Sequence, residues 1–294
     1  MGSTTIPAGT KWWSGGKSPF NVSYGKVMMW YFLMSDAFTF GAFLISYGTI
    51  RFSVNHWADP NRVFNAFPFA GHDANLPLAF VSLMTFILIF SSVTMVLAVH
   101  EGHHMNRKGV EKFMILTILG GLAFLGCQAW EWTHLLTGEH VAMLSDGSMG
   151  VLPTTVKANP WGADLTHTEL LGALQKSTHE QLVAIASTLH HGAEGAAHNV
   201  STMGNEELIN MIAASGVHAT HSGPIAFGGY FFGITGFHGF HVFSGVIINV
   251  VMYIKTKLGH FDQRGHYEMI EKAGLYWHFV DLVWVFVFLC FYLI

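Results

Sequence analysis

Five long apolar stretches dominate the sequence, with polar segments between them. They lie at about 27–50, 78–99, 113–135, 225–254 and 273–294. A hydrocarbon core of about 30 Å needs roughly 20 apolar residues of helix, and helix is the form that satisfies the backbone of such segments inside a membrane. The pattern therefore predicts an all-α membrane protein in which five transmembrane helices form a bundle.

The polar segments predict how the chain is organised. We expect an N-terminal tail at 1–26, transmembrane helices one to three in 27–137, an insertion at 138–222, and helices four and five in 223–294. Within the insertion, TELLGALQKSTHEQLVAIASTLHH and NEELINMIAAS show the apolar spacing of short amphipathic helices. The insertion is therefore expected to be a long external loop subdomain, between helices three and four, that lies on a partner.

Composition agrees with membrane solvation, because 51% of the residues are hydrophobic and only 11% are charged. The formal net charge of −4 shows no basic excess, so no nucleic-acid partner is expected. The tail and the connections 100–112 and 255–272 hold ten of the fourteen Lys and Arg residues. By the positive-inside rule these segments face the cytoplasm, which predicts a cytoplasmic N-terminus and an external C-terminus.

Two carboxyl groups are expected near the middle of the membrane, Asp36 and Asp281. A carboxyl at that depth must find a hydrogen-bond donor or hold a proton. Asp36 is therefore either a proton antenna that faces a polar crevice or a structural carboxyl between packed helices. His278 lies three residues before Asp281 on the same helical face, which predicts an internal hydrogen bond between them.

Histidines raise the question of a metal or haem site. His238 and His241 share a helical face that neighbouring glycines are expected to make narrow. Haem sites in bundles usually need facing histidines on another helix, so buried, hydrogen-bonded imidazoles are the favoured interpretation. The eight insertion histidines, at 140, 167, 179, 190, 191, 198, 218 and 221, lack fixed ligand spacing and are expected at the surface. We therefore predict no metal site and no catalytic residue in this chain.

A competing motif is HEGHH, with His100, His103 and His104, which resembles a histidine box of membrane di-iron desaturases. Such an enzyme needs several boxes that converge on one cytoplasmic site. The other candidate, HGFH at 238–241, lies inside a span. No GxSxG, P-loop, dinucleotide fingerprint or CxxCH motif occurs, so a desaturase-like oxygenase remains the enzyme alternative.

The apolar stretches resemble one known family in order. The segment GHFDQRGHYEMIEKAGLYWHFVDLVWVFVFLCFYLI resembles the last helix, with its preceding loop, of cytochrome c oxidase subunit III, and GFHGFHVFSGVIINV resembles that family's FHGxHV helix. The segments SSVTMVLAVHEGHH, LGCQAWEW and MWYFLMSDAFTFGAFLISY are similar to three further helices. The long form of the family has seven helices, and the five matched here resemble its last five, as in a five-helix bacterial form.

The resemblance implies subunit III of a proton-pumping haem-copper terminal oxidase in aerobic respiration, in a bacterial inner membrane with its C-terminus in the periplasm. Family members bind phospholipids, support proton uptake into the catalytic subunit and protect it during turnover. The expected partners are oxidase subunits I and II, which would hold the haem and copper, with no cofactor in this chain. Cytochrome c and quinol both remain open as electron donors, and the accessory subunit of a nitric oxide reductase is a related alternative.

The resemblance also assigns roles to residues. Asp36 matches a carboxylate that is usually Glu in the family's SE motif, and Gln128 with Glu131 matches a QxxE pattern. The predicted buried polar network consists of Gln128, Glu131, His238, His241, His278 and Asp281. Candidates for contact with lipid headgroups or another subunit are His260, His266 and Glu271. The insertion at 138–222 replaces a short family loop, which suggests a further respiratory complex or a cytochrome as its partner.

Overall fold

The computed structural model describes residues 23–54, 57–58, 63–64, 78–153, 164–189, 200–217, 219–221 and 225–293. Most of the predicted N-terminal tail lies outside the described residues. So do four of the insertion histidines, at 190, 191, 198 and 218. All predicted site residues within the spans are described.

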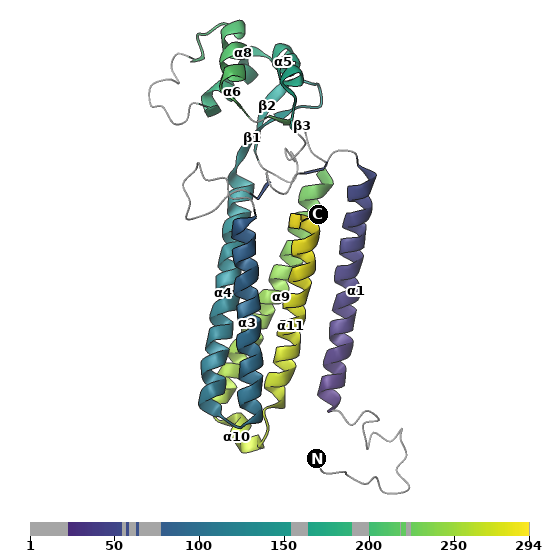
Figure 1. Ribbon diagram of the computed structural model, residues 1–294, viewed down its shortest axis with the longest axis vertical. Helices are drawn as coiled ribbons and strands as arrows, with labels where there is room; N and C mark the ends of the chain where they lie inside the picture. Colours follow the sequence, from purple (N-terminus) through teal and green to yellow (C-terminus); the bar gives the residue numbers. More distant parts are fainter. Residues whose placement is uncertain are drawn as a thin grey trace.

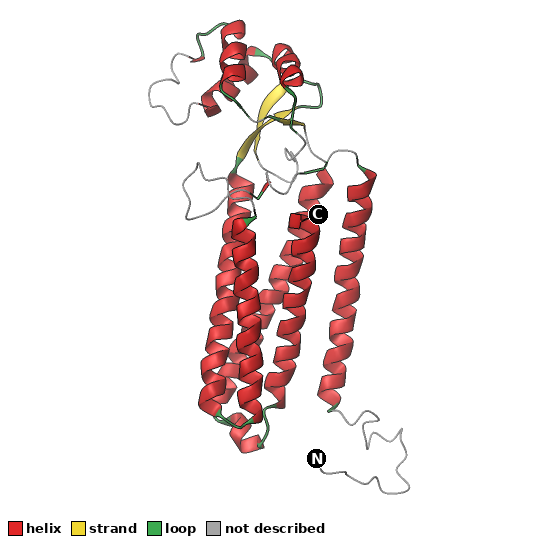
Figure 2. Cartoon of the chain, in the orientation of Figure 1, coloured by secondary structure: helices red, strands yellow, loops and turns green. Residues whose placement is uncertain are grey.

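Five helices are long and apolar enough to cross a membrane, as predicted (Figures 1 and 2). They are α1 (Tyr24–Ser53), α3 (Ala79–His103), α4 (Arg107–Thr137), α9 (Ile225–Lys257) and α11 (Glu268–Phe288), the last continued by a π-helical turn, η1 (Leu289–Leu293). The chain is therefore a multi-pass membrane protein with a helical bundle. Most helices extend a few residues beyond the predicted apolar stretch, because their polar ends continue the helix towards water.

Short connections place successive helices side by side. Between α3 and α4 only residues 104–106 intervene, and Met105 there has a φ of 56°, in the left-handed region. Asn106 caps α4, because its side-chain oxygen accepts a hydrogen bond from the Gly109 backbone N at 3.4 Å. A connection this short forces α3 and α4 to run antiparallel as neighbours.

One helix of the bundle is much less covered than the others. In its most apolar window, only 6% of α1 is buried, compared with 28–44% for the other four spans. The helix packs against α11 and α9, and its outer face carries exposed aromatic side chains such as Trp30 and Phe38. Figure 1 shows α1 at the edge of the bundle, beside α11. This edge position leaves half of the helix to lipid or to another subunit.

Trp277 joins three helices at the centre of the bundle. Its side chain is fully buried, and its Nε1 donates a hydrogen bond to Ser91 Oγ at 3.2 Å. Glycines on two neighbouring helices make room for the indole: a Cβ added to Gly121 would lie 2.6 Å from Trp277 Cη2, and one added to Gly245 would lie 2.9 Å from Cε3. Close approach at these two glycines therefore sets the spacing of α4, α9 and α11.

The predicted narrow glycine face around His238 is largely wrong. Four glycines were expected to form this face, at 229, 233, 236 and 239. Of these, only Gly236 has a close neighbour, with its added Cβ 3.0 Å from Trp132 Cη2, whereas a Cβ added to any of the other three has nothing within 4 Å. Gly229 and Gly233 instead line a groove of about 320 Å³ next to α1. Longer side chains make the contact between α1 and α9 here, with Ser46 Oγ 2.6 Å from the Tyr230 hydroxyl, so the small residues face a groove rather than a neighbouring helix.

The insertion folds into a small subdomain at the end of the bundle opposite the start of α1 (Figure 1). It contains helices α5 (His167–Lys176), α6 (His179–Leu189) and α8 (Asn205–Ala214) and strands β1 (Glu139–Met143), β2 (Met149–Pro153) and β3 (Thr220–His221). The three amphipathic helices confirm the periodicity, but the sheet was not predicted. Its order is β2-β1-β3, with β1 antiparallel to β2 and parallel to β3.

Local chemistry explains why the subdomain helices and its hairpin form. Thr166 and Glu169 make a capping box at the start of α5. In the turn between β1 and β2, Asp146 Oδ1 accepts hydrogen bonds from Ser148 N at 2.9 Å and Ser148 Oγ at 2.6 Å, which lower the pKa of the Asp146 carboxyl. The subdomain buries its own apolar cluster, which shares no member with the bundle core. The two parts therefore have separate cores.

Candidate functional site

The first polar group inside the bundle joins α1 to α9. Asp36 Oδ2 lies 3.4 Å from His241 Nε2, and the two side chains are 15% and 9% exposed. The other ring nitrogen, His241 Nδ1, lies 2.8 Å from the Phe237 carbonyl oxygen. A carbonyl only accepts, so Nδ1 carries a proton and Nε2 of the neutral ring does not. Asp36 Oδ2 makes no hydrogen bond among the described residues, and a further proton on the carboxyl or on the ring would turn this close approach into a hydrogen bond or an ion pair.

Tyr276 and Ser244 extend this group to α11. The Tyr276 hydroxyl lies 2.7 Å from Ser244 Oγ and 3.2 Å from the His241 carbonyl oxygen, which also accepts a bond from Ser244 Oγ at 2.9 Å. These bonds hold the backbone of α9 against α11 beside the ring of His241. Neither residue could be recognised from the sequence, because a Ser and a Tyr on different helices carry no spacing signal.

The second group surrounds Glu131 on α4. Its carboxyl accepts a hydrogen bond from Gln128 Nε2 at 3.1 Å and one from the Tyr292 hydroxyl, at 3.2 and 3.3 Å from the two oxygens. Glu131 and Gln128 are each 5% exposed and Tyr292 is 1% exposed. Two residues of the predicted polar network, Gln128 and Glu131, are thus bonded to each other, and Tyr292 from η1 is a third member of the group that the sequence did not reveal.

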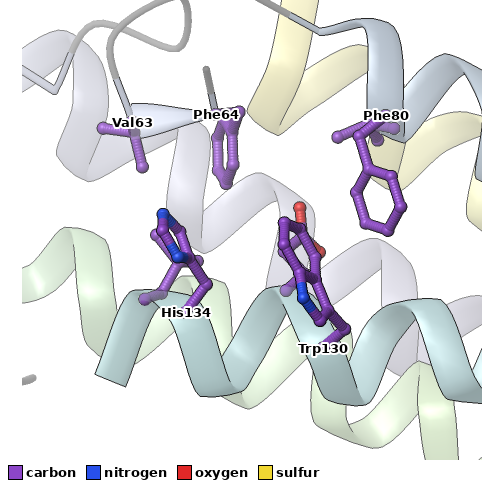
Figure 3. Close-up of a pocket in the computed structure, with 8 residues that line it drawn as sticks. Val63, Phe64, Phe80, Trp130 and His134 are labelled. Atoms are coloured by element: carbon purple, nitrogen blue, oxygen red, sulfur yellow. The ribbon is translucent and has the colours of Figure 1, made fainter. Parts of the chain in front are cut away.

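A small cavity adjoins Glu131 and is drawn in Figure 3. Its lining comes from the end of α4, the start of α3 and residues 63 and 64. On α4, Trp130 and His134 stack with ring centroids 5.5 Å apart and ring planes at 5°. Figure 3 shows both rings on the helix, opposite Val63 and Phe64.

The third group lies where α3 meets α11. His278 Nδ1 lies 2.6 Å from Ser92 Oγ, and both Asp281 oxygens are buried without a hydrogen bond among the described residues. The predicted bond between His278 and Asp281 is therefore wrong, because Ser92 on the facing helix supplies a nearer partner. All three residues line a groove of about 590 Å³ whose other walls are mainly apolar.

The fourth group is His238, which is completely buried. Its Nε2 donates to the Val280 carbonyl oxygen at 3.1 Å, and its ring packs against those of Phe124 and Trp284, with centroids at 5.7 and 5.1 Å. The structure therefore places the residues of the predicted polar network in four local groups along the bundle. Within the described residues, no group of three or more His, Cys, Asp or Glu side chains has the arrangement of a metal site.

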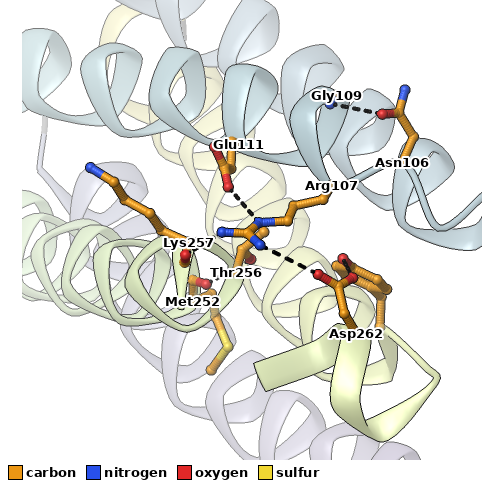
Figure 4. Close-up of polar contacts among 9 residues, drawn as sticks. Asn106, Arg107, Gly109, Glu111, Met252, Thr256, Lys257 and Asp262 are labelled. Atoms are coloured by element: carbon orange, nitrogen blue, oxygen red, sulfur yellow. Dashed lines mark hydrogen bonds and ion pairs between the residues drawn. The ribbon is translucent and has the colours of Figure 1, made fainter. Parts of the chain in front are cut away.

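At the opposite end of the bundle from the subdomain, Arg107 holds three segments together (Figure 4). Its Nε donates to Glu111 Oε1 at 2.9 Å, one Nη donates to the Lys257 carbonyl oxygen, and the other lies 3.7 Å from Asp262 Oδ2. Asp262 belongs to the short helix α10 (His260–Arg264). Arg107 thus links the start of α4 to the end of α9 and to α10.

Tyr267, the residue just before α11, contacts the same Asp262 carboxyl as Arg107. Its hydroxyl donates to Asp262 Oδ1 at 2.5 Å, and its side chain is 7% exposed. Burial, together with the hydrogen bond to Asp262 and that residue's charge, raises the pKa of Tyr267 to about 12. The phenol is therefore protonated at all physiological pH values and acts here as a donor.

The predicted contact candidates lie at the same end. His260 and His266 are exposed, while Glu271 forms an ion pair with Lys26 of α1 at 2.7 Å. This pair ties α1 to α11 near the membrane boundary. A role of the three residues in contact with lipid or another subunit stays a prediction.

The HEGHH motif also lies at this end, at the close of α3. The rings of His100 and His104 are in tilted contact, with centroids 4.5 Å apart, and His104 Nδ1 lies 3.0 Å from the His100 carbonyl oxygen. His103 is exposed. Helical spacing therefore explains the cluster, and HGFH at 238–241 lies inside a span and does not converge with it.

Comparisons with known proteins point to one family. Residues 212–294 match the family model described as cytochrome c oxidase subunit III. The chain is 32% identical over 207 residues to cytochrome c oxidase subunit 3 of Pylaiella littoralis, covering 66% of this chain and 71% of that protein. It is 31% identical to the same-named protein of Marchantia polymorpha, covering 66% and 72%. Together with the five spans, these matches show that the chain belongs to the cytochrome c oxidase subunit III family.

Proposed function

We propose that this chain supports proton uptake and stability of the catalytic subunit in a proton-pumping haem-copper terminal oxidase, without a redox centre of its own. Family membership supports its association with other oxidase subunits. The observation that carries the proton role is the close approach of Asp36 to His241 at 3.4 Å, since these two groups can share one proton beyond the one on Nδ1. Its position on α1, the least covered helix, leaves that proton near the edge of the bundle.

Such a pair suits reversible proton storage better than permanent structure. A carboxylate paired with an imidazolium and a carboxylic acid paired with a neutral imidazole hold the same proton in two places. The ring is oriented by Phe237 and flanked by the Phe40 ring at 5.4 Å, so it stays in position when the proton moves. The proposal therefore assigns Asp36 and His241 jointly as the proton-holding site, with Tyr276 and Ser244 as positioning residues.

The test replaces Asp36 within the assembled complex. Asp36→Asn removes the titratable group but keeps its size, so assembly should persist while oxidase turnover falls above neutral pH and the active lifetime shortens. Asp36→Glu restores a carboxyl and should recover both. Turnover against pH and the number of turnovers before inactivation are the two measurements.

Ser35→Ala provides the matched control, since Ser35 is the exposed neighbour of Asp36 on the same helix. It should leave both measurements unchanged. If Asp36→Asn also left turnover and lifetime unchanged at every pH, the proton role would be refuted. Equal losses in the Asn and Glu variants would indicate a packing effect instead.

We further propose oxidase subunits I and II as partners, with haem and copper held there. The cationic connections between α3 and α4 and between α9 and α11 support a cytoplasmic N-terminus and a periplasmic C-terminus in a bacterial inner membrane. The exposed aromatic face of α1 supports phospholipid contact, with His260 and His266 near the headgroups. The insertion, with its separate core, suits contact with a further respiratory complex or a cytochrome.

Purification in mild detergent through a tag on this chain tests the assembly. The expected result is a large co-purifying subunit with haem and copper, identified by optical spectrum and metal analysis. A lone chain that carries iron without haem would refute the proposal and favour the desaturase-like oxygenase that uses the HEGHH motif. Reduced-minus-oxidised spectra of the complex would also identify its haem types.

A further inference from the structure

Glu131 and its cavity have no part in the proposed function. The residue lies six positions before the end of α4 at Thr137, or about 9 Å from the end that carries the subdomain. Its carboxyl receives hydrogen bonds from two neutral donors, Gln128 and Tyr292, and none of the ion pairs in the described chain includes it. Burying a carboxylate without a cation costs far more than burying a carboxylic acid, so the group holds a proton.

The cavity beside Glu131 has the size of one water molecule. It offers about 10 Å³ for the centre of a water, which is close to the minimum of roughly 10–15 Å³ that a buried water needs. A buried water also needs polar partners. Glu131 and His134 both line the cavity and supply them, while Val63, Phe64, Phe80 and Val81 form its apolar walls.

His134 connects the cavity to the outside. It is exposed, it lies three residues beyond Glu131 on the same face of α4, and its ring is held by stacking on Trp130. The other titratable groups close to Glu131 in the described chain are Tyr292 from η1 and Cys127 from α4. Neither lines the cavity, so His134 is the titratable side chain that shares its lining with Glu131.

We propose that this cavity binds one water molecule that carries protons between Glu131 and His134, so that the buried carboxyl exchanges its proton with the solution on the subdomain side of the membrane. In one transfer, Glu131 gives its proton to the water oxygen while the water gives one of its own protons to a ring nitrogen of His134. The water is regenerated, and His134 then releases the proton to solution. The ligand of the site is thus water, or transiently hydronium.

Infrared spectroscopy of the purified full-length chain with its co-purifying subunits provides the test. Glu131→Gln should remove one protonated-carboxyl C=O band, which assigns that band to Glu131. On transfer to D₂O, the band should shift as the proton is replaced by deuterium, and the rate of the shift measures access. Val81→Ile fills the cavity, and His134→Phe keeps the stack on Trp130 but removes the ring nitrogens.

Both variants should slow the exchange of the Glu131 band by about tenfold or more, because each removes one hydrogen-bonded link of the route. Val93→Ile makes the same substitution on the lipid-facing side of α3, where Val93 is 50% exposed, and should leave the rate unchanged. Val63→Ile is a second cavity-filling variant if Val81→Ile fails to fold.

Two results would overturn the inference. If Glu131→Gln removed no carboxyl band at any pH at which the complex is folded, Glu131 would hold no exchangeable proton. If the band exchanged equally fast in the parent chain and in all variants, the proton would follow another route. Neither result bears on Asp36, because the readout is the Glu131 carboxyl itself rather than turnover.

Discussion

The substitution Gly121→Ala tests whether close packing on Trp277 sets the spacing of the bundle. The added Cβ would lie 2.6 Å from Trp277 Cη2 and 2.7 Å from Val246 Cγ2, well inside van der Waals contact. The indole has little room to withdraw, because it is fully buried, bonded to Ser91 and in contact with Gly245 on its other side. Overpacking of this kind costs about 1–3 kcal/mol.

Gly126→Ala is the matched control on the same helix, since nothing lies within 4 Å of its added Cβ. Both substitutions replace Gly by Ala in a helix interior, which stabilises a helix by up to about 1 kcal/mol. The difference between the two variants therefore isolates the overpacking cost. We expect Gly126→Ala to be neutral or stabilising and Gly121→Ala to be less stable than it by about 2 kcal/mol.

The assay is reversible unfolding of the purified chain in mixed micelles by increasing SDS, followed by circular dichroism to obtain the free energy of unfolding. A double variant, Gly121→Ala with Trp277→Phe, tests the contact directly, because Trp277→Phe removes the ring atoms that the new Cβ would meet. In that background the penalty of Gly121→Ala should shrink, giving a coupling of about 1 kcal/mol. Equal free energies for Gly121→Ala and Gly126→Ala, within about 0.5 kcal/mol, would refute the reasoning.

Three further predictions concern the ends of the bundle. Arg107→Ala should lower the free energy of unfolding by about 1 kcal/mol, because its ion pairs are partly exposed, while Lys108→Ala should have no effect; SDS unfolding measures both. The pKa of Tyr267 is raised to about 12 in the folded chain. Its protonated hydroxyl therefore adds to the free energy of unfolding fully below pH ~10, and this contribution is lost as the pH rises through 12. Tyr267→Phe should flatten stability across that window and remove one tyrosinate with a midpoint near pH 12 from the alkaline absorbance titration. Deletion of 138–222 should leave all five spans inserted, since the two cores are separate; loss of insertion in a protease-protection assay would contradict this.

The sequence by itself determined the five spans, because apolar runs of membrane length have one stable form in a bilayer. It also determined the amphipathic helices of the insertion, whose 3.6-residue periodicity is local information. The bond between Gln128 and Glu131 is equally local, since three residues along a helix bring side chains to one face.

Only the tertiary structure decided which polar groups meet across helices. His278 and Asp281 share a face, yet His278 Nδ1 is hydrogen-bonded to Ser92 of α3 instead. No pattern within α11 predicts this contact, because the partner lies on another helix. The pairing of Asp36 with His241 likewise depends on how α1 packs against α9. The sheet of the insertion joins β1 to β3 across a long stretch of chain, so its formation is equally non-local. Helix periodicity fixes neighbours along one element, whereas the rotation and spacing of helices, set by contacts such as Trp277 against Gly121 and Gly245, fix neighbours between elements.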